Sequence, residues 1–198
     1  FEDALVYRPD NVRILQFMIR LDMVRGILDV AETRTQKLLQ LDPNNSVANF
    51  FMSNFQIQRG EFELAKESLR RLLERKKDPM VMNSMAWVLQ ETGELAEAES
   101  MIDAAIAITD ASPMLWDTSG VIRQKQNKLD EAVSAFEKAI ALDKNYPASV
   151  INLANIHLSE GRTQLALNLV EALSEDMYDL RQEHRTALRE LRKKLGFE

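Results

Sequence analysis

The chain has 198 residues, of which 45% are hydrophobic, and it carries a formal net charge of −6 at pH 7. This acidic balance argues against nucleic acid as the main ligand, because such binding depends on cationic side chains that meet phosphates. The absence of cysteine excludes disulfides and thiol chemistry, and no stretch reaches the roughly 18 apolar residues that a membrane span requires.

Small residues recur along the chain at a fixed spacing. Alanines stand at positions 31, 65, 98, 132 and 166, separated by 34, 33, 34 and 34 residues. Glycines stand at 26, 60, 93 and 161, and Asn127 fills the remaining slot of that series. A period near 34 residues is typical of a repeated pair of antiparallel helices joined by a tight turn. The sequence therefore predicts an all-α fold of about twelve helices without a sheet.

The predicted elements begin with a partial repeat. Pro9 lies 34 residues before Pro43, so residues 1–11 fit the end of a repeat whose first helix precedes this sequence. We expect the apolar edge formed by Phe1, Leu5 and Tyr7 to allow self-association, since exposed apolar patches tend to be covered. Five tandem repeats follow, at residues 12–45, 46–78, 79–112, 113–146 and 147–176.

The fourth repeat shows the pattern most clearly. Leu115 and Ile122 are seven residues apart, so they share one face of a predicted first helix. Gly120 is small enough for a neighbouring helix to approach closely. Asn127 tolerates the left-handed conformation that a tight turn requires, and Ala132 then begins the apolar face of the second helix.

These repeats, with a bulky residue at place 4, small residues at places 8, 20 and 27, and proline near place 32, resemble the tetratricopeptide repeat. The register holds over about nine-tenths of the chain. The first repeat departs from the pattern, with Ile19 at the small place 8 and Thr35 at the bulky place 24. The resemblance implies a right-handed superhelical array whose first helices line an inner wall. A looser likeness is to bacterial members tied to the cell envelope and to exopolysaccharide systems.

The last predicted element is a strongly polar helix at residues 177–198, with Gly196 as its C-terminal cap. Leu188 and Leu191 can face the last repeat, while Arg185 and Arg192 face solvent. A helical array needs such a capping helix for solubility. A basic helix that grips nucleic acid or anionic lipid is the alternative, and the interleaved glutamates favour the cap.

The resemblance also implies where a partner binds, because places 2, 5, 9, 12 and 13 of each repeat lie on the inner wall. Peptide-binding residues are therefore predicted on all five first helices: Arg13, Gln16, Arg20, Phe50, Asn54, Met80, Asn83, Trp87, Met114, Asp117, Gln124 and Asn155. Their amides suit the main chain of an extended peptide. Trp87 is either an anchor for the ligand or a packing residue between repeats. Ile151 and Leu158 also occupy wall places and are interpreted as packing residues.

Related chaperone cofactors clamp a terminal carboxylate with lysine, asparagine and arginine at places 5 and 9 of successive repeats. Here those places hold Gln16 and Arg20, then Phe50 and Asn54, and then Asn83 with Trp87, so the lysines are missing. The sequence therefore favours an extended segment over a charged terminus as the ligand.

Nothing in the sequence indicates catalysis. The two histidines, His157 and His184, lack metal-ligand spacing, and the glycines form no phosphate-binding loop. We therefore predict no enzyme activity, no cofactor and no metal. The predicted function is a scaffold or adaptor for protein or peptide partners, without nucleic acid and without insertion into a membrane. The alternative is a regulatory or substrate-recruiting segment of a larger enzyme. Cytoplasm and a bacterial periplasm or envelope both remain open.

Overall fold

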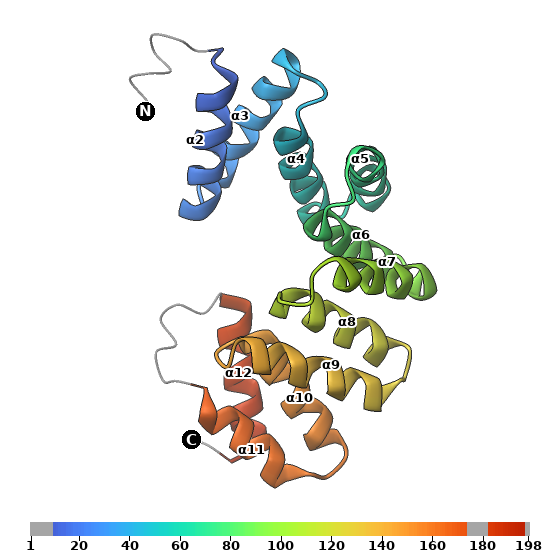
Figure 1. Cartoon of the computed structure of the whole chain (residues 1–198). Coiled ribbons are helices and arrows are strands. Elements are labelled where there is room, and N and C mark those ends of the chain that lie inside the picture. The colour runs from blue at the N-terminus through green and yellow to red at the C-terminus, as the bar shows by residue number, and fades with distance from the viewer. Residues whose placement is uncertain (1–9, 174–181, 197–198) are drawn as a thin grey trace. The chain divides into compact units, whose positions relative to one another are not determined.

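The computed structural model describes residues 10–173 and 182–196. Over these residues it holds eleven α-helices and no strand, which confirms the predicted all-α fold (Figure 1). The helices are α2 (Val12–Arg25), α3 (Leu28–Leu41), α4 (Ser46–Gln58), α5 (Phe62–Arg75), α6 (Pro79–Glu91), α7 (Leu95–Ile108), α8 (Pro113–Lys125), α9 (Leu129–Leu142), α10 (Pro147–Ser159), α11 (Thr163–Ala172) and α12 (Gln182–Lys194).

Some predictions concern residues beyond this description. The apolar edge at Phe1, Leu5 and Tyr7 and the beginning of the last helix near Met177 lie outside the described residues. Each predicted repeat from residue 12 to residue 176 contains two helices, and the repeat boundaries themselves stay a prediction.

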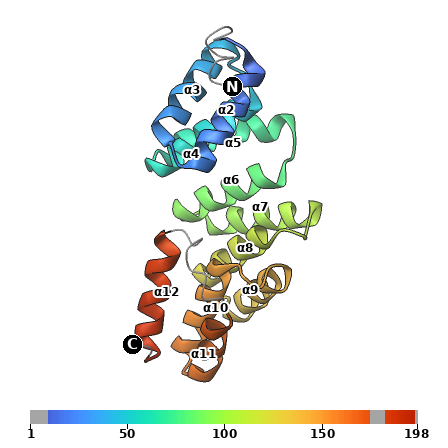
Figure 2. The same ribbon diagram turned by 90° about the vertical axis from the view of Figure 1, so that its left-hand side faces the viewer.

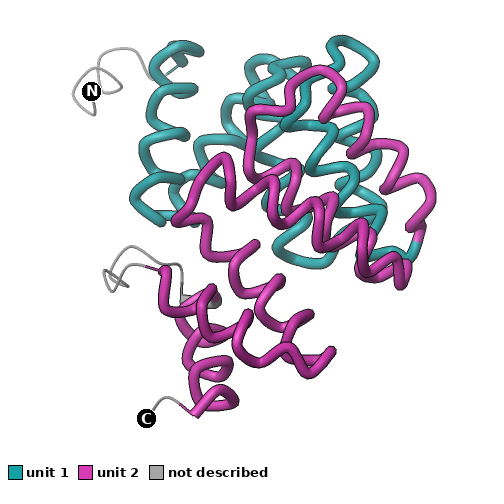
Figure 3. Tube along the Cα trace, turned by 60° about the horizontal axis from the view of Figure 1, so that its bottom comes forward, with its two compact units in different colours: residues 1–93 teal, residues 94–198 magenta. Residues whose placement is uncertain are grey.

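The chain divides into two compact units, residues 1–93 and 94–198, called unit 1 and unit 2 below (Figure 3). In unit 1, which holds α2 to α6, each helix packs on the next one in the chain. In unit 2, α7 packs on α8, and the same order continues through α11. Helices that contact chiefly their neighbours in sequence are the hallmark of repeat architectures.

The turns within the helix pairs depend on residues that adopt the left-handed conformation. Gly60 has φ 72° and Gly93 has φ 84°, and Asn127 has φ 62°. Asn127 is the only non-glycine residue with positive φ in the part of the chain that the structure describes. Asparagine adopts this conformation more readily than most L-residues. Asn127, at the one position of the series without glycine, therefore still supports a turn, as predicted.

The periodic alanines hold each helix pair together. All five of them, at positions 31, 65, 98, 132 and 166, are completely buried, with 0% exposure. A close approach occurs between α8 and α9, where Gly120 faces the ring of Phe136. A Cβ at position 120 would lie 2.5 Å from the Cε1 atom of that ring. The predicted close approach at Gly120 is therefore confirmed, and it depends on the missing side chain.

The two departures in the first repeat are accommodated within the α2–α3 pair. Ile19 and Thr35 are both completely buried, so the larger residue at place 8 occurs together with a smaller one at place 24. The Thr35 hydroxyl donates a hydrogen bond of 2.7 Å to the Ala31 carbonyl oxygen. A buried hydroxyl with a partner avoids the cost of an unsatisfied polar group, so the departures do not interrupt the core.

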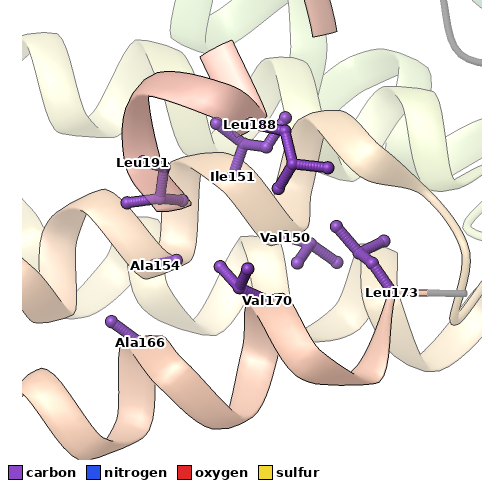
Figure 4. Close-up of a cluster of buried hydrophobic side chains, with 8 residues drawn as sticks. All are labelled: Val150, Ile151, Ala154, Ala166, Val170, Leu173, Leu188 and Leu191. Atoms are coloured by element: carbon purple, nitrogen blue, oxygen red, sulfur yellow. The ribbon is translucent and has the colours of Figure 1, made fainter. Parts of the chain in front are cut away.

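The last helix of unit 2, α12, departs from the packing order of the helices before it. Both Figure 1 and Figure 2 show α12 beside α10, and α12 packs on α10. Leu188 and Leu191, each 1% exposed, complete an apolar cluster with α10 and α11 (Figure 4). This burial confirms the predicted apolar face of the helix. Arg185 and Arg192, which the sequence predicts to face solvent, are in contrast half-buried.

Candidate functional site

The candidate site is a pocket of about 380 Å³ within unit 1. Its walls come from α2, α4, the end of α5, the connection between α5 and α6, and the first turn of α6. The lining is largely apolar with charged residues among it: Arg20, Ser46, Val47, Phe50, Phe51, Leu72, Arg75, Lys76, Asp78, Met80 and Val81. Pockets of this size that combine apolar walls with a few polar groups are where proteins bind ligands.

Local capping fixes the two helices that open onto the pocket. At the start of α6, an Asp78 carboxylate oxygen accepts a hydrogen bond of 3.0 Å from the Met80 N–H, and Pro79 occupies the first helical position. At the start of α4, the Asn45 amide oxygen accepts a hydrogen bond of 3.2 Å from the Ala48 N–H. Such N-caps satisfy donors that a helix cannot satisfy itself, and they hold the first turns of α4 and α6 in place.

Three cations surround the apolar part of the pocket. Arg75 donates to the Asn44 carbonyl oxygen at 2.5 Å, and the Lys76 ammonium lies 3.9 Å from the Asp78 carboxylate. The exposed Arg20 has no hydrogen bond or ion pair to any described residue. With Asp78 as the only acidic group in the lining, the pocket carries a local positive charge on an acidic chain.

Three of the predicted peptide-binding residues meet in this pocket. Arg20 comes from α2, Phe50 from α4 and Met80 from α6, and Met80 remains 44% exposed. Two other predicted residues of unit 1 do not line it: Arg13 is exposed on α2, and Asn54 is half-buried on α4.

The other predicted residues of unit 1 have different surroundings. The Gln16 amide donates a hydrogen bond of 3.0 Å to the Asn45 amide oxygen, so it links α2 to the cap of α4. The half-buried Trp87 ring contacts the Phe62 ring edge to face, with centroids 6.1 Å apart, and its role as an anchor for a ligand stays a prediction. Asn83 is 8% exposed, and its amide oxygen has no hydrogen-bond partner.

Unit 2 holds the remaining predicted residues, and none of them lines its pocket of about 340 Å³ beside Trp116 and Arg123. Asp117 accepts hydrogen bonds from the Ser149 hydroxyl at 2.7 Å and from the Asn152 amide at 3.4 Å. Burial raises the pKa of the Asp117 carboxyl group, although both donors oppose this shift. Asp117 thus joins α8 to α10. The other members of the set are half-buried: Met114, Gln124 and Asn155.

Sequence reasoning missed the wall that α5 supplies. It considered only first helices, whereas Leu72, Arg75 and Lys76 belong to the end of a second helix and the loop after it. One signal was present: the stretch from 70 to 77 reads RRLLERKK, the densest run of cations before the last helix of an acidic chain. Such a run indicates a surface that attracts acidic partners.

No other described feature points to a reactive centre. Within residues 10–173 and 182–196, no group of three histidine, aspartate or glutamate side chains is placed to hold a metal ion. Over the same residues, none of the helices has the length and apolar character needed to cross a membrane. His157 is buried, and its Nδ1 atom lacks a hydrogen-bond partner.

Comparison with family models identifies repeats in two stretches of the chain. Two models described as tetratricopeptide repeat match this chain, one over residues 80–109 and one over residues 124–191. A curated relative is tetratricopeptide repeat protein 21A of Mus musculus, which is 25% identical over 115 residues. That alignment covers 58% of this chain and 9% of the mouse protein, so the chain corresponds to a small part of that relative.

Solved structures share the fold at low sequence identity. The protein TTC0263, a thermophilic TPR protein of Thermus thermophilus, is 20% identical with a TM-score of 0.77, and the match covers 91% of this chain and 98% of that one. YrrB, a TPR protein with an unusual peptide-binding site, is 18% identical with a TM-score of 0.60, at 98% and 97% coverage. Residues 80–109 and 124–191 are therefore tetratricopeptide repeats, and the fold is the one that solved tetratricopeptide repeat proteins share.

Proposed function

We propose that the chain is a non-enzymatic scaffold and that the pocket of unit 1 binds an apolar side chain from an extended segment of a partner protein. The observation that carries this proposal is the pocket itself, because three successive first helices line it, α4 and α6 with apolar side chains and α2 with Arg20, together with the helix between α4 and α6. Proteins of this family are generally scaffolds for protein interactions.

The chemistry of the walls supports a side chain as the ligand. Phe50 and Phe51 pack edge to face, with centroids 5.9 Å apart, and they offer a rigid aromatic surface. Met80 is exposed and flexible, and its thioether adapts to differently shaped apolar groups. Because a few buried aromatic contacts usually dominate the energy of an interface, Phe50 is the expected anchor of the pocket.

The positive charge at the pocket favours acidic residues next to that side chain in the partner segment. Arg20, Arg75 and Lys76 surround the opening, and Arg20 has no hydrogen bond or ion pair to a described residue. Guanidinium groups bind carboxylates in a planar, two-point geometry. We therefore expect the partner segment to carry aspartate or glutamate next to its apolar residue.

Asn83 offers a contact for the main chain of such a segment. It lies three residues after Met80, so the two side chains are on the same side of α6. Its amide oxygen is buried without a partner, and an unsatisfied buried acceptor costs free energy until a donor reaches it. A peptide N–H is a suitable donor.

The proposal is tested with a random peptide library displayed on phage and the purified chain as bait. Recovered peptides are synthesised, and their dissociation constants are measured by fluorescence anisotropy. We expect the Met80→Ala and Phe50→Ala variants to bind these peptides about five- to tenfold more weakly. We also expect Arg20→Glu to select against acidic peptides in particular.

Leu64→Ala is the matched control, since Leu64 is also exposed on unit 1 (52%) but does not line the pocket. It should leave the dissociation constants unchanged. A library that yields no binding peptide, or peptides that bind all four variants equally, would contradict the proposed function.

A further inference from the structure

The inference concerns the pocket of about 340 Å³ in unit 2, called the Trp116 pocket below. We infer that this pocket binds an arginine side chain of a partner protein, and that its guanidinium group stacks on the Trp116 ring in the position that the Lys138 ammonium group now holds. None of the predicted peptide-binding residues lines the Trp116 pocket, and it shares no lining residue with the pocket of unit 1. The inference therefore does not depend on the function proposed above.

The Trp116 pocket lies between the two helices of the fourth repeat. Trp116 and Arg123 come from α8, and because they are seven residues apart they share one face of that helix. The other lining residues belong to α9 and extend over about two helical turns: Asp130, Glu131, Ser134, Ala135 and Lys138. Apart from Ala135, these residues of α9 are exposed, so the pocket is accessible from solvent.

The Trp116 ring is a fixed platform for a cation. Its indole N–H donates a hydrogen bond of 2.8 Å to the Asp110 carbonyl oxygen, which fixes the orientation of the ring. The Lys138 ammonium nitrogen lies 4.1 Å from the ring centroid. Aromatic faces attract cations that come within roughly 6 Å of the centroid, so the ring already binds a positive charge.

Lys138 is a weakly held occupant of this platform. Its side chain is exposed, and it forms neither a hydrogen bond nor an ion pair with the residues that the structure describes. A cation–π contact at an exposed site contributes little free energy, and holding a lysine in one conformation costs side-chain entropy. A cation that makes further contacts in the pocket can therefore displace the Lys138 ammonium group.

The remaining polar groups of the pocket favour arginine as that cation. Ser134 lies one turn before Lys138 on α9 and offers a hydroxyl oxygen as an acceptor, and Asp130 follows one turn further with a carboxylate. Neither forms a hydrogen bond or an ion pair with a described residue. A guanidinium group stacks on an aromatic face and still presents N–H donors along its edge, so it can use the ring and these acceptors together.

Arg123 does not compete for these groups, because it is already paired. Its guanidinium group lies 2.9 Å from the Asp103 carboxylate and 3.3 Å from the Glu131 carboxylate. Two carboxylates thus offset one guanidinium group, and Asp130 adds a further negative charge. Once the Lys138 ammonium group leaves, the site is negative on a chain whose net charge is −6, and such a surface attracts basic partners.

The test titrates the blocked tripeptide Gly-Arg-Gly into the full chain and follows tryptophan fluorescence. The chain has two tryptophans, so a Trp87→Phe background leaves Trp116 as the single reporter. We expect saturable quenching by the arginine peptide and none by the same peptide with citrulline, which keeps the shape of arginine but not its charge. A peptide with trimethyl-lysine should bind more weakly, because its cation has no N–H donor.

Two exposed residues of the pocket provide the variants. Lys138→Ala should tighten binding of the arginine peptide about two- to fivefold, because it removes the competing cation. Asp130→Asn should weaken it about two- to fivefold. Lys144→Ala is the matched control, since Lys144 is an exposed lysine outside the pocket. It changes the net charge as Lys138→Ala does and should leave the dissociation constant nearly unchanged.

Circular dichroism verifies that each variant keeps its helical content. The inference is overturned if the citrulline peptide quenches as the arginine peptide does, or if Lys138→Ala binds no more tightly than Lys144→Ala. It is also overturned if the arginine peptide changes Trp116 fluorescence in neither the Lys138→Ala variant nor the Trp87→Phe background alone. Equal binding of the trimethyl-lysine peptide would contradict the assignment to arginine and make a quaternary ammonium group the ligand instead.

Discussion

Units 1 and 2 are built from the same kind of repeat, yet their first helices differ in how much of their surface is open to other molecules. In unit 1, Phe50 stands at place 5 of its repeat and lines an open pocket. In unit 2, Ile151 stands at the same place of the fifth repeat and is 5% exposed within a cluster that includes α12. The comparison shows that the repeat fixes the position of a side chain, while the elements packed on it decide whether a partner can reach it.

Two polar residues at place 5, Asn83 and Asp117, also differ, while the third, Gln16, is bonded to Asn45 within unit 1. Asn83 in unit 1 keeps a buried amide oxygen without a partner. Asp117 in unit 2 is bonded to Ser149 and Asn152 of the next first helix. Asp117 is thus used for internal contacts, whereas Asn83 keeps an acceptor without a partner.

The largest expected effect is on the free energy of unfolding, and it should differ between two phenylalanines. Phe136 is completely buried in unit 2, and Phe136→Ala should lower the free energy of unfolding by about 3–5 kcal/mol, the usual range for a buried aromatic residue. Phe50→Ala should cost clearly less, because Phe50 is only half-buried. Urea unfolding followed by circular dichroism measures both. Equal losses would mean that Phe50 belongs to the core of unit 1 and that the pocket is not a ligand site.

A smaller effect is expected from filling the space at Gly120. The added methyl group of Gly120→Ala would collide with the Phe136 ring, which has no room to move among Ala132, Leu153 and Ile156. Overpacking of this kind costs about 1–3 kcal/mol. The measurement is thermal unfolding of Gly120→Ala with and without Phe136→Leu.

The double variant is the control for that collision. Since residues in direct contact do not contribute additively, Phe136→Leu should make the added methyl group less harmful. Additive losses from the two changes would show that α8 and α9 do not approach closely at this point.

The smallest expected effect is a dependence on pH that originates in unit 2. Burial lowers the pKa of the His157 imidazole, and Arg162 lowers it further. Below the ordinary pKa of about 6.5 the unfolded chain binds the proton more readily, so His157 should reduce stability as the pH falls from there toward its folded pKa. Urea unfolding at a series of pH values measures this slope.

His157→Gln should flatten that slope, and hydrogen exchange should locate the change in unit 2. Unit 1 contains neither of the two histidines, so helices α2 to α5 provide the internal reference. A variant with the original slope would show that His157 is not the group that titrates.

The sequence predicted the fold through residues whose role is local. Gly60, Gly93 and Asn127 predicted the turns because left-handed backbone is tied to residue type. Ala132 and its counterparts predicted the contacts within each helix pair because a close approach admits only small residues. These requirements are met within about one repeat, so they are visible in sequence spacing alone.

The site could be predicted only in part, because it depends on contacts beyond one repeat. Arg20, Phe50 and Met80 were predicted from their places on first helices, but Arg75 and Lys76 reach the pocket from the end of α5. Similarly, the pattern of Leu188 and Leu191 predicted which side of α12 is buried. It contained no information on whether that side would meet α10 or continue the array after α11.

The place of α12 in the chain has a consequence for the order of events during synthesis. Helices α8 and α10 leave the ribosome before α12 does, and about twenty residues separate the end of α10 from the start of α12, which corresponds to roughly one to four seconds of translation. During that interval the face that α12 later covers is open on the nascent chain. Until α12 has been made, the side of α10 that carries Ile151 and Ala154 lacks the leucines that later bury it.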